Sequence, residues 1–226
     1  MANEKSRTRA GEVYESIRAE ILNGRFQPGQ RLRFIELAER FSVSQPVIRE
    51  ALARLAGQGL AIALPQQGFR VSELSLTDLD ELTEARCDIE ALTFRYAVER
   101  GDLRWESAVV AAHHQLAATP TTVGGELNEE WFEIHEEFHR TLLEGCHNER
   151  LLGVALTLRD AAALYRHWSQ PIGHNYGRDV AGEHRALLDA GVARHPDTAA
   201  VLLRNHIERT TASLRPLPEA PGRPPR

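Results

Sequence analysis

The sequence predicts a mainly α-helical protein in two parts, a small module of three helices with a β-hairpin, followed by an antiparallel all-helical bundle. Three observations support this prediction. Apolar residues recur at helical spacing in the first part of the chain. Two short apolar runs then flank the turn Gln66-Gln67-Gly68. From Asp78 onward the pattern is helical, with no strand signal.

Size and composition limit the classes of protein. The chain has 226 residues, of which 42% are hydrophobic, enough to form real cores. No run approaches the roughly 18 apolar residues of a membrane span, and the first residues lack the apolar region of a signal peptide. Only Cys87 and Cys146 are present, without a CxxC pattern, which favours neither a disulfide framework nor a thiolate metal site. We therefore expect a cytoplasmic protein in a reducing compartment that does not bind membranes.

The charge is divided unevenly along the chain. Residues 1–73 contain 11 Lys and Arg against 8 Asp and Glu, a net charge of +3, whereas the remainder has 16 against 24, a net charge of -8. A basic module next to an acidic domain is typical of a nucleic-acid-binding protein.

Two helices open the first part. In VYESIRAEIL the residues Val13, Ile17 and Ile21 lie at helical spacing, and Asn23-Gly24 ends the helix. The segment FIELAERF, residues 34–41, predicts a second short helix. The sequence SVS then interrupts the pattern before a third helix.

The third helix carries an arginine on its outer face. Ser44 is a plausible N-cap, and Arg49 points away from the buried face. That face consists of Ile48, Ala51, Leu52 and Leu55. Three helices followed by a hairpin form a winged helix-turn-helix, whose third helix fits a DNA major groove while the hairpin tip lies near the flanking backbone or minor groove. The alternative is a small helical core whose arginines are simply solvated.

The first part resembles the DNA-binding domain of the GntR family of bacterial transcription regulators. The similarity covers about residues 12–72 and rests on EILNGRFQPGQRL, ELAERFSVSQPVIREALARLAGQGL and PQQGFRV. It implies that Arg49, in the R-E-A-L motif, contacts DNA and that Gly68 lets the wing approach the backbone.

Two positions depart from the family pattern. Gln45 and Ile35 stand where the family usually or often has Arg, and Arg33 is a candidate substitute for the second. Since Gln pairs with adenine and Arg prefers guanine, the operator is expected to differ at one base. The candidate DNA-contacting residues are Arg33, Ser44, Gln45, Arg49 and Gly68.

The second part begins after the segment 73–78, where Ser75 or Thr77 can cap a helix. Six helices are predicted at about 77–100, 103–118, 126–146, 149–169, 178–191 and 197–214. They form a bundle. The proline-rich residues 215–226 are expected to be a disordered tail. The predicted domains are thus residues 1–73 and 77–214.

Histidines lie on the apolar faces of three of these helices. His135 and His139 share one face one turn apart, and His184 and His206 lie among apolar residues of later helices. Any one of them alone is usually a core residue with a hydrogen-bond partner. Four together are costly to bury, and a divalent cation satisfies all of them at once.

The second part resembles the FCD effector domain of the FadR subfamily over about residues 77–214. The similarity rests on Phe138-His139, Glu183-His184 and His206-Ile207. It implies that a metal bound by one Asp and three His lies next to a small carboxylate effector. Here His135 replaces the Asp, which leaves a four-His site for zinc, the most available ion, or nickel.

Arg86 lies on the apolar face of the first bundle helix, where the family often has an Arg. A buried guanidinium needs an anion. That anion is either Glu90 of the protein or a carboxylate effector bound in bidentate fashion.

Two functions remain. The first is a ligand-responsive transcription regulator, a homodimer on an inverted-repeat operator and a repressor released by its effector. The alternative is a metal-dependent enzyme that uses the four-His site, although Glu136 and Glu137 are predicted to point away from the histidines, which leaves no obvious general base.

Overall fold

The computed structural model describes residues 8–22, 24–124, 126–169 and 178–214. The protein is mainly α-helical, as predicted, and consists of two compact units. One unit contains the described residues up to Leu82, residues 157–169 and Leu214; the other contains residues 83–156 and 178–213. Residues 215–226, predicted to be a tail, lie outside the described residues, and the domain limits 1–73 and 77–214 stay a prediction.

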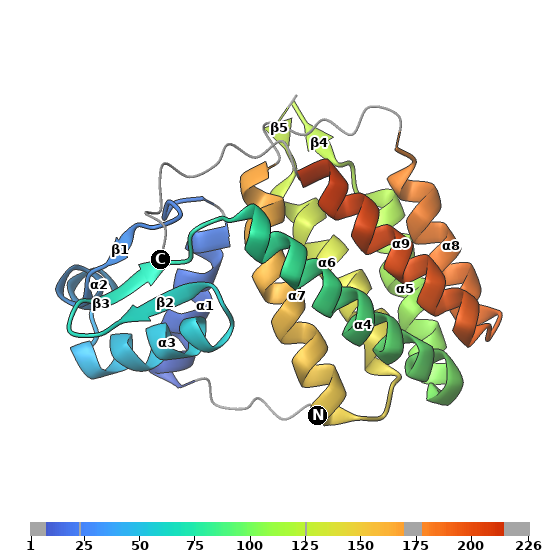
Figure 1. The fold of residues 1–226 in the computed structure, drawn as a ribbon, viewed down its shortest axis with the longest axis horizontal. Coiled ribbons are helices and arrows are strands. Elements are labelled where there is room, and N and C mark those ends of the chain that lie inside the picture. Colours follow the sequence, from blue (N-terminus) through green and yellow to red (C-terminus); the bar gives the residue numbers. More distant parts are fainter. Residues whose placement is uncertain (1–7, 23, 125, 170–177, 215–226) are drawn as a thin grey trace. The chain divides into compact units, whose positions relative to one another are not determined.

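The first unit contains the predicted three helices and hairpin (Figure 1). The helices are α1 (Arg9–Leu22), α2 (Phe34–Phe41) and α3 (Gln45–Gly57), and the hairpin strands are β2 (Ala61–Leu64) and β3 (Gly68–Val71). Strand β1 (Arg31–Leu32) was not predicted, because two residues are too few to show a period. It pairs antiparallel with β3, which gives a sheet of order β1-β3-β2.

Apolar side chains on the facing sides of α1 and α3 form the core of this unit. Ile17, Ile21, Ile48 and Leu52 are fully buried, and each fully buried side chain of this size contributes roughly 1.5–3 kcal/mol. Ile48 and Leu52 lie on the face opposite Arg49, so the packing of α3 determines which residues it exposes.

The long helices that follow the hairpin are α4 (Leu76–Arg100), α5 (Leu103–Ala118), α6 (Glu129–Glu144), α7 (Glu149–Ser169), α8 (Val180–Val192) and α9 (Pro196–Leu214). The second unit contains the whole of α5, α6 and α8 and parts of α4, α7 and α9. Ser75, one of the two predicted caps, accepts a hydrogen bond from the backbone N–H of Asp78 at 3.4 Å at the start of α4. Among the described residues, none of the helices combines the length and apolarity needed to cross a membrane.

The prediction of no strand after Asp78 was wrong. Strands β4 (Thr122–Val123) and β5 (Glu126–Leu127) form a short antiparallel hairpin. Each has two residues, too few for a sequence period, and Gly124 between them adopts φ 64, in the left-handed region that favours glycine. Helix α6 therefore begins at Glu129 rather than at 126, with Asn128 as its N-cap.

Tight packing around Trp105 fixes α5 against α6. The indole Nε1 donates to the carbonyl of Thr141 at 2.8 Å. A Cβ added to Gly145 would lie 2.8 Å from this indole, so only glycine fits at the end of α6. Phe138 and Leu142 of α6 are fully buried beside it. Helix α6 thus has a fixed rotation about its axis, which determines where its histidines point.

Candidate nucleic-acid interface and candidate metal centre

Helix α3 exposes the polar residues expected to meet DNA. Gln45 is its first residue, and Gln45, Arg49 and Ser44 are all exposed. Ser44 is the N-cap residue by backbone geometry, φ -76 and ψ 154, but its hydroxyl makes no capping hydrogen bond. The start of α3 was therefore predicted correctly, and the capping bond was not.

The ring of Phe34 lies close to both α3 and the wing, the hairpin of β2 and β3. The Arg49 Cζ lies 4.7 Å from the centroid of the Phe34 ring, within range of a cation–π interaction. On the wing, Gly68 has φ +86, and a Cβ added there would lie 3.2 Å from Phe34. Phe34 also packs edge-on against Phe69, with ring centroids 5.9 Å apart. This role of Phe34 could not be predicted from a local sequence pattern, because the contacts join three elements.

Arg33 and the wing carry further positive charge. Arg33 lies before α2, where its Nη1 donates to Glu36 at 2.8 Å. Both side chains are about two-thirds exposed, and such a pair contributes little to stability, so Arg33 is able to exchange Glu36 for a phosphate. Arg31, which was not among the predicted DNA-contacting residues, faces Arg70 across β1 and β3 and donates to Gln67 at 3.2 Å.

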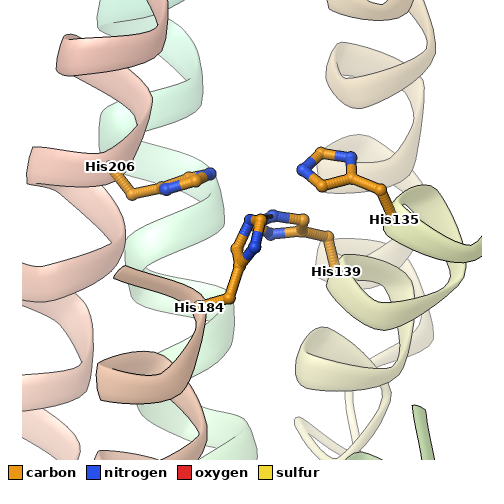
Figure 2. A group of neighbouring side chains, drawn as sticks. All are labelled: His135, His139, His184 and His206. Carbon is orange, nitrogen blue, oxygen red and sulfur yellow. Dashed lines mark hydrogen bonds between the residues drawn. The ribbon is translucent and has the colours of Figure 1, made fainter. Parts of the chain in front are cut away.

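The four predicted histidines converge from three helices of the second unit (Figure 2). His135 and His139 come from α6, His184 from α8 and His206 from α9. All four are buried, and one ring nitrogen of each lies within 4.8 Å of those of the others. The remaining described His/Cys/Asp/Glu residues form no other such group.

The contacts of the four imidazoles indicate which nitrogen of each ring faces the centre of the group. The Nε2 atoms of His139 and His184 lie 3.3 Å apart. His135 and His206 each direct Nδ1 toward a carboxylate, Glu136 at 3.3 Å and Glu183 at 2.8 Å. In both of these rings Nε2 is therefore the nitrogen left for the centre of the group.

Burial keeps His184 neutral. Burial lowers the pKa of His184 far below its usual value, and the neighbouring His135 and His206 lower it further. A neutral imidazole is the form that binds a metal.

The donor set fits a late first-row ion. A tetrahedral Zn²⁺ with Zn–N bonds of about 2.0–2.1 Å places its nitrogens about 3.3 Å apart, the separation of the His139 and His184 Nε2 atoms. The widest separation of up to 4.8 Å is larger, so one imidazole must turn inward when an ion binds. Four neutral nitrogens suit zinc, nickel or copper and not magnesium, which prefers oxygen.

Arg86 has a protein partner. Its Nε lies 2.6 Å from a carboxylate oxygen of Glu90, and the two side chains are 7% and 0% exposed. Of the two anions expected for Arg86, the structure provides Glu90.

Glu183 and Arg178 are residues of the site that the sequence analysis did not single out. Glu183 was noted only as part of Glu183-His184, and its contact with His206 joins α8 to α9, which a helical period cannot reveal. Of the two glutamates expected to point away, Glu136 instead lies beside His135, because the ring turns its Nδ1 outward from the centre.

Two family models match almost the whole chain. Residues 9–71 match the gntR family of bacterial regulatory proteins, and residues 81–209 match the FCD domain. The chain belongs to the GntR family and carries an FCD domain. It is therefore a DNA-binding transcription regulator.

Similar proteins support the assignment of this chain to the GntR family of regulators. It is 32% identical to the uncharacterized HTH-type transcriptional regulator BphR of Paraburkholderia xenovorans over 90% of this chain and 84% of that protein. It is 31% identical to the HTH-type transcriptional repressor GlaR of Escherichia coli over 91% and 92%. The solved structure of McbR/YncC of E. coli has the same fold, with a TM-score of 0.78 at 20% identity, covering 92% of this chain and 97% of that one. Because the family and the relatives BphR and GlaR are regulators, the chain is a regulator and not an enzyme.

Proposed function

We propose that this regulator is a repressor that binds an inverted-repeat operator as a homodimer and leaves it when a small carboxylate binds at a metal in the helical domain. Residues 1–73 act as the DNA-binding domain and residues 77–214 as the effector domain. Convergence of four buried histidines in a chain that also carries a recognition helix is the observation that supports this function most strongly.

The DNA-binding part of the proposal rests on the exposed face of α3. Gln45 and Arg49 supply base contacts, Ser44 and Arg33 supply hydroxyl and phosphate contacts, and Gly68 lets the wing approach the backbone. One such module buries too little surface for high affinity. Two copies related by a two-fold axis double the contacts, which is why a homodimer and an inverted repeat are proposed together.

The effector part rests on the charge of the site. His135, His139, His184 and His206 hold the ion, zinc by availability or nickel. When bound, the ion supplies a positive charge, and a zinc held by four imidazoles would take an anion by expanding to five ligands. A small carboxylate matches both, and Arg86 contributes a second positive charge if it exchanges Glu90 for the ligand.

The effect of the ligand on DNA binding passes from the bundle to the DNA-binding module through the segment that connects them. An ion and a ligand tie α6, α8 and α9 together at one point and so change the relative free energies of the bundle's conformations. The segment 73–78 connects this domain to the DNA-binding module. The repressor sign is proposed because one of the relatives, GlaR, is named a repressor. As a DNA-binding regulator, the protein is expected to act in the cytoplasm.

One experiment tests the proposal as a whole. Purified protein without a His-tag is loaded with Zn²⁺, its operator is selected from random duplexes, and fluorescence anisotropy measures affinity while small carboxylates are added. We expect one carboxylate to weaken operator binding at least tenfold with the Zn²⁺-loaded protein and to have no effect after chelation. The proposal fails if metal-loaded and chelated proteins respond equally to every acid, or if sedimentation finds only monomers on the operator.

A further inference from the structure

Glu183 is the centre of a network behind the four histidines. Its carboxylate accepts hydrogen bonds from Arg178 Nε at 2.9 Å and Nη2 at 2.5 Å, and from Arg209 at 3.2 Å. It also lies 2.8 Å from Nδ1 of His206. The side chain is 13% exposed, so these bonds are largely shielded from water.

The network decides which nitrogen of His206 carries the proton. Both oxygens of Glu183 accept hydrogen bonds from guanidinium groups, Oε1 from Arg178 Nε and Arg209 and Oε2 from Arg178 Nη2, so the carboxylate pairs with two positive charges and accepts on both oxygens. An ionised carboxylate only accepts hydrogen bonds, so Nδ1 of His206 must donate. A neutral imidazole that donates from Nδ1 has its lone pair on Nε2, the form that ligates a metal through Nε2.

Arg178 competes with Glu183 for Nδ1 of His206 and would favour the other tautomer. Its Nη2 lies 3.4 Å from the same Nδ1 and also donates to the carbonyl of His206 at 3.1 Å and to Thr210 at 3.1 Å. A guanidinium has no acceptor, so an Arg178 N–H that replaced Glu183 at Nδ1 would require the lone pair there. The proton would then move to Nε2 and block it. Glu183 and Arg178 therefore favour opposite tautomers of His206, and the shorter distance favours Glu183.

We propose that Glu183 is a positioning residue that holds His206 in the tautomer that binds metal, and that it also supplies a negative charge behind an otherwise uncharged set of four imidazoles. This inference rests on the metal site of the proposed function. Second-sphere carboxylates behind a histidine ligand typically change metal affinity 10- to 100-fold. The other carboxylate, Glu136, is weaker in this role because its contact is longer, 3.3 Å, and its side chain is 32% exposed.

The substitution Glu183→Gln separates the two tautomers. The side chains have the same shape, but Arg178 Nε and Arg209 both donate to Oε1, so this position must keep the amide oxygen of Gln. The amide N–H₂ then takes the place of Oε2, the atom that faces Nδ1 of His206. The imidazole must then accept at Nδ1 and carry its proton on Nε2. Glu183→Asp keeps an acceptor-only group, and is therefore the matched conservative variant.

Two measurements on the full chain test the proposal. Long-range ¹H–¹⁵N correlation spectra of chelated, ¹⁵N-histidine-labelled protein report the His206 tautomer. We expect Nδ1–H in the wild type and in Glu183→Asp, and Nε2–H in Glu183→Gln. Competition with a chromogenic chelator reports Zn²⁺ affinity, expected to fall 10- to 100-fold in Glu183→Gln and only a few-fold in Glu183→Asp. Glu106→Gln, which removes a partly buried carboxylate paired with Arg194 at 3.1 Å, is the control and should leave both readings unchanged.

The outcomes distinguish this proposal from the metal site itself. Wild-type affinity and an Nδ1–H tautomer in Glu183→Gln would overturn the role of Glu183. Equal losses of affinity in the Gln and Asp variants would also overturn it, because donor and acceptor character would then not be the cause. If the wild type binds no Zn²⁺, the metal site fails, and the tautomer spectra still decide whether Glu183 controls His206.

Discussion

Arg49 of α3 lies over the ring of Phe34, its Cζ 4.7 Å from the ring centroid, and the same ring would lie only 3.2 Å from a Cβ at position 68 of the wing. A guanidinium stacked on an aromatic face loses less freedom when it binds DNA. The arginine expected to read a base and the glycine expected to approach the backbone are therefore held in one fixed relation by a residue that touches both.

Arg49→Ala tests base reading. We expect operator affinity to fall by about 1–3 kcal/mol, with relaxed preference at one position of each half-site, because a bidentate Arg–guanine contact contributes this much discrimination. Anisotropy titrations at one salt concentration against the operator, single-base variants and random duplex measure both effects. An equal loss on operator and random DNA would assign Arg49 to a phosphate.

Gln45→Arg tests the departure from the family pattern. Gln45 is exposed at the first residue of α3, where a Gln pairs with adenine and an Arg with guanine. We expect the variant to prefer guanine where the wild type selects adenine, at a single position per half-site. Repeating the selection of operators with both proteins measures this, and Gln45→Ala, which should lose preference there without gaining another, is the control. Identical selected sequences would show that Gln45 does not read a base.

His139→Ala separates the metal from DNA binding. Its Nε2 lies 3.3 Å from that of His184, so the truncation removes one ligand from the centre of the group. We expect metal content to fall below about a tenth of an equivalent. Operator affinity without effector should stay within about twofold, because the helices of the DNA-binding unit have their own core.

Elemental analysis of protein without a His-tag, before and after reloading, measures the metal, and His195→Ala is a control outside the group of four. A wild type that takes up no transition metal would mean that the histidines are core residues.

The positions that sequence predicted correctly are those with a strong local period. Ile48, Leu52 and Leu55 placed Arg49 on the exposed face of α3, and the same reasoning brought His135 and His139 to one buried face of α6. What sequence missed depends on contacts between distant elements. Phe34 meets Gly68 and Arg49 only after the hairpin folds back, and Glu183 meets His206 only after α8 and α9 pack.

Arg86 and Glu90 form a buried pair, and removing one member alone should leave an uncompensated charge. We expect Arg86→Met to cost about 3–5 kcal/mol of unfolding free energy, and the double variant Arg86→Met/Glu90→Leu to recover much of it, because an apolar pair of similar volume replaces a desolvated ion pair. Urea unfolding in chelator measures both. Additive losses in the double variant would show that the two side chains are not coupled.

The same arginine allows a test of effector binding. If Arg86 exchanges Glu90 for a carboxylate ligand, Arg86→Lys keeps the charge and loses the bidentate contact. The rise in melting temperature that a carboxylate causes in metal-loaded wild type should then shrink in the variant. An unchanged rise would leave Arg86 as a structural partner of Glu90 alone.

Protonation of His113 is expected to make the free energy of unfolding depend on pH. Its side chain is 9% exposed and packs edge-on against Phe138, with ring centroids 5.6 Å apart. Burial lowers the pKa of His113 below its usual value near 6.5, and Arg185 lowers it further.

Above pH 6.5 the imidazole is neutral in both the folded and unfolded states, so it causes no change of stability with pH. As the pH falls below 6.5, the unfolded state binds a proton that the folded state does not bind, so the free energy of unfolding decreases. The loss continues until the pH reaches the lower pKa of the folded state, at up to about 1.4 kcal/mol per pH unit for one proton.

Urea unfolding of chelated protein between pH 7.5 and about 5 measures the slope, and we expect it to be shallower in His113→Leu. The exposed His114 on the same helix provides the matched control, His114→Gln. A slope in His113→Leu equal to that of the wild type would show that His113 takes up its proton as readily in the folded state as in the unfolded chain.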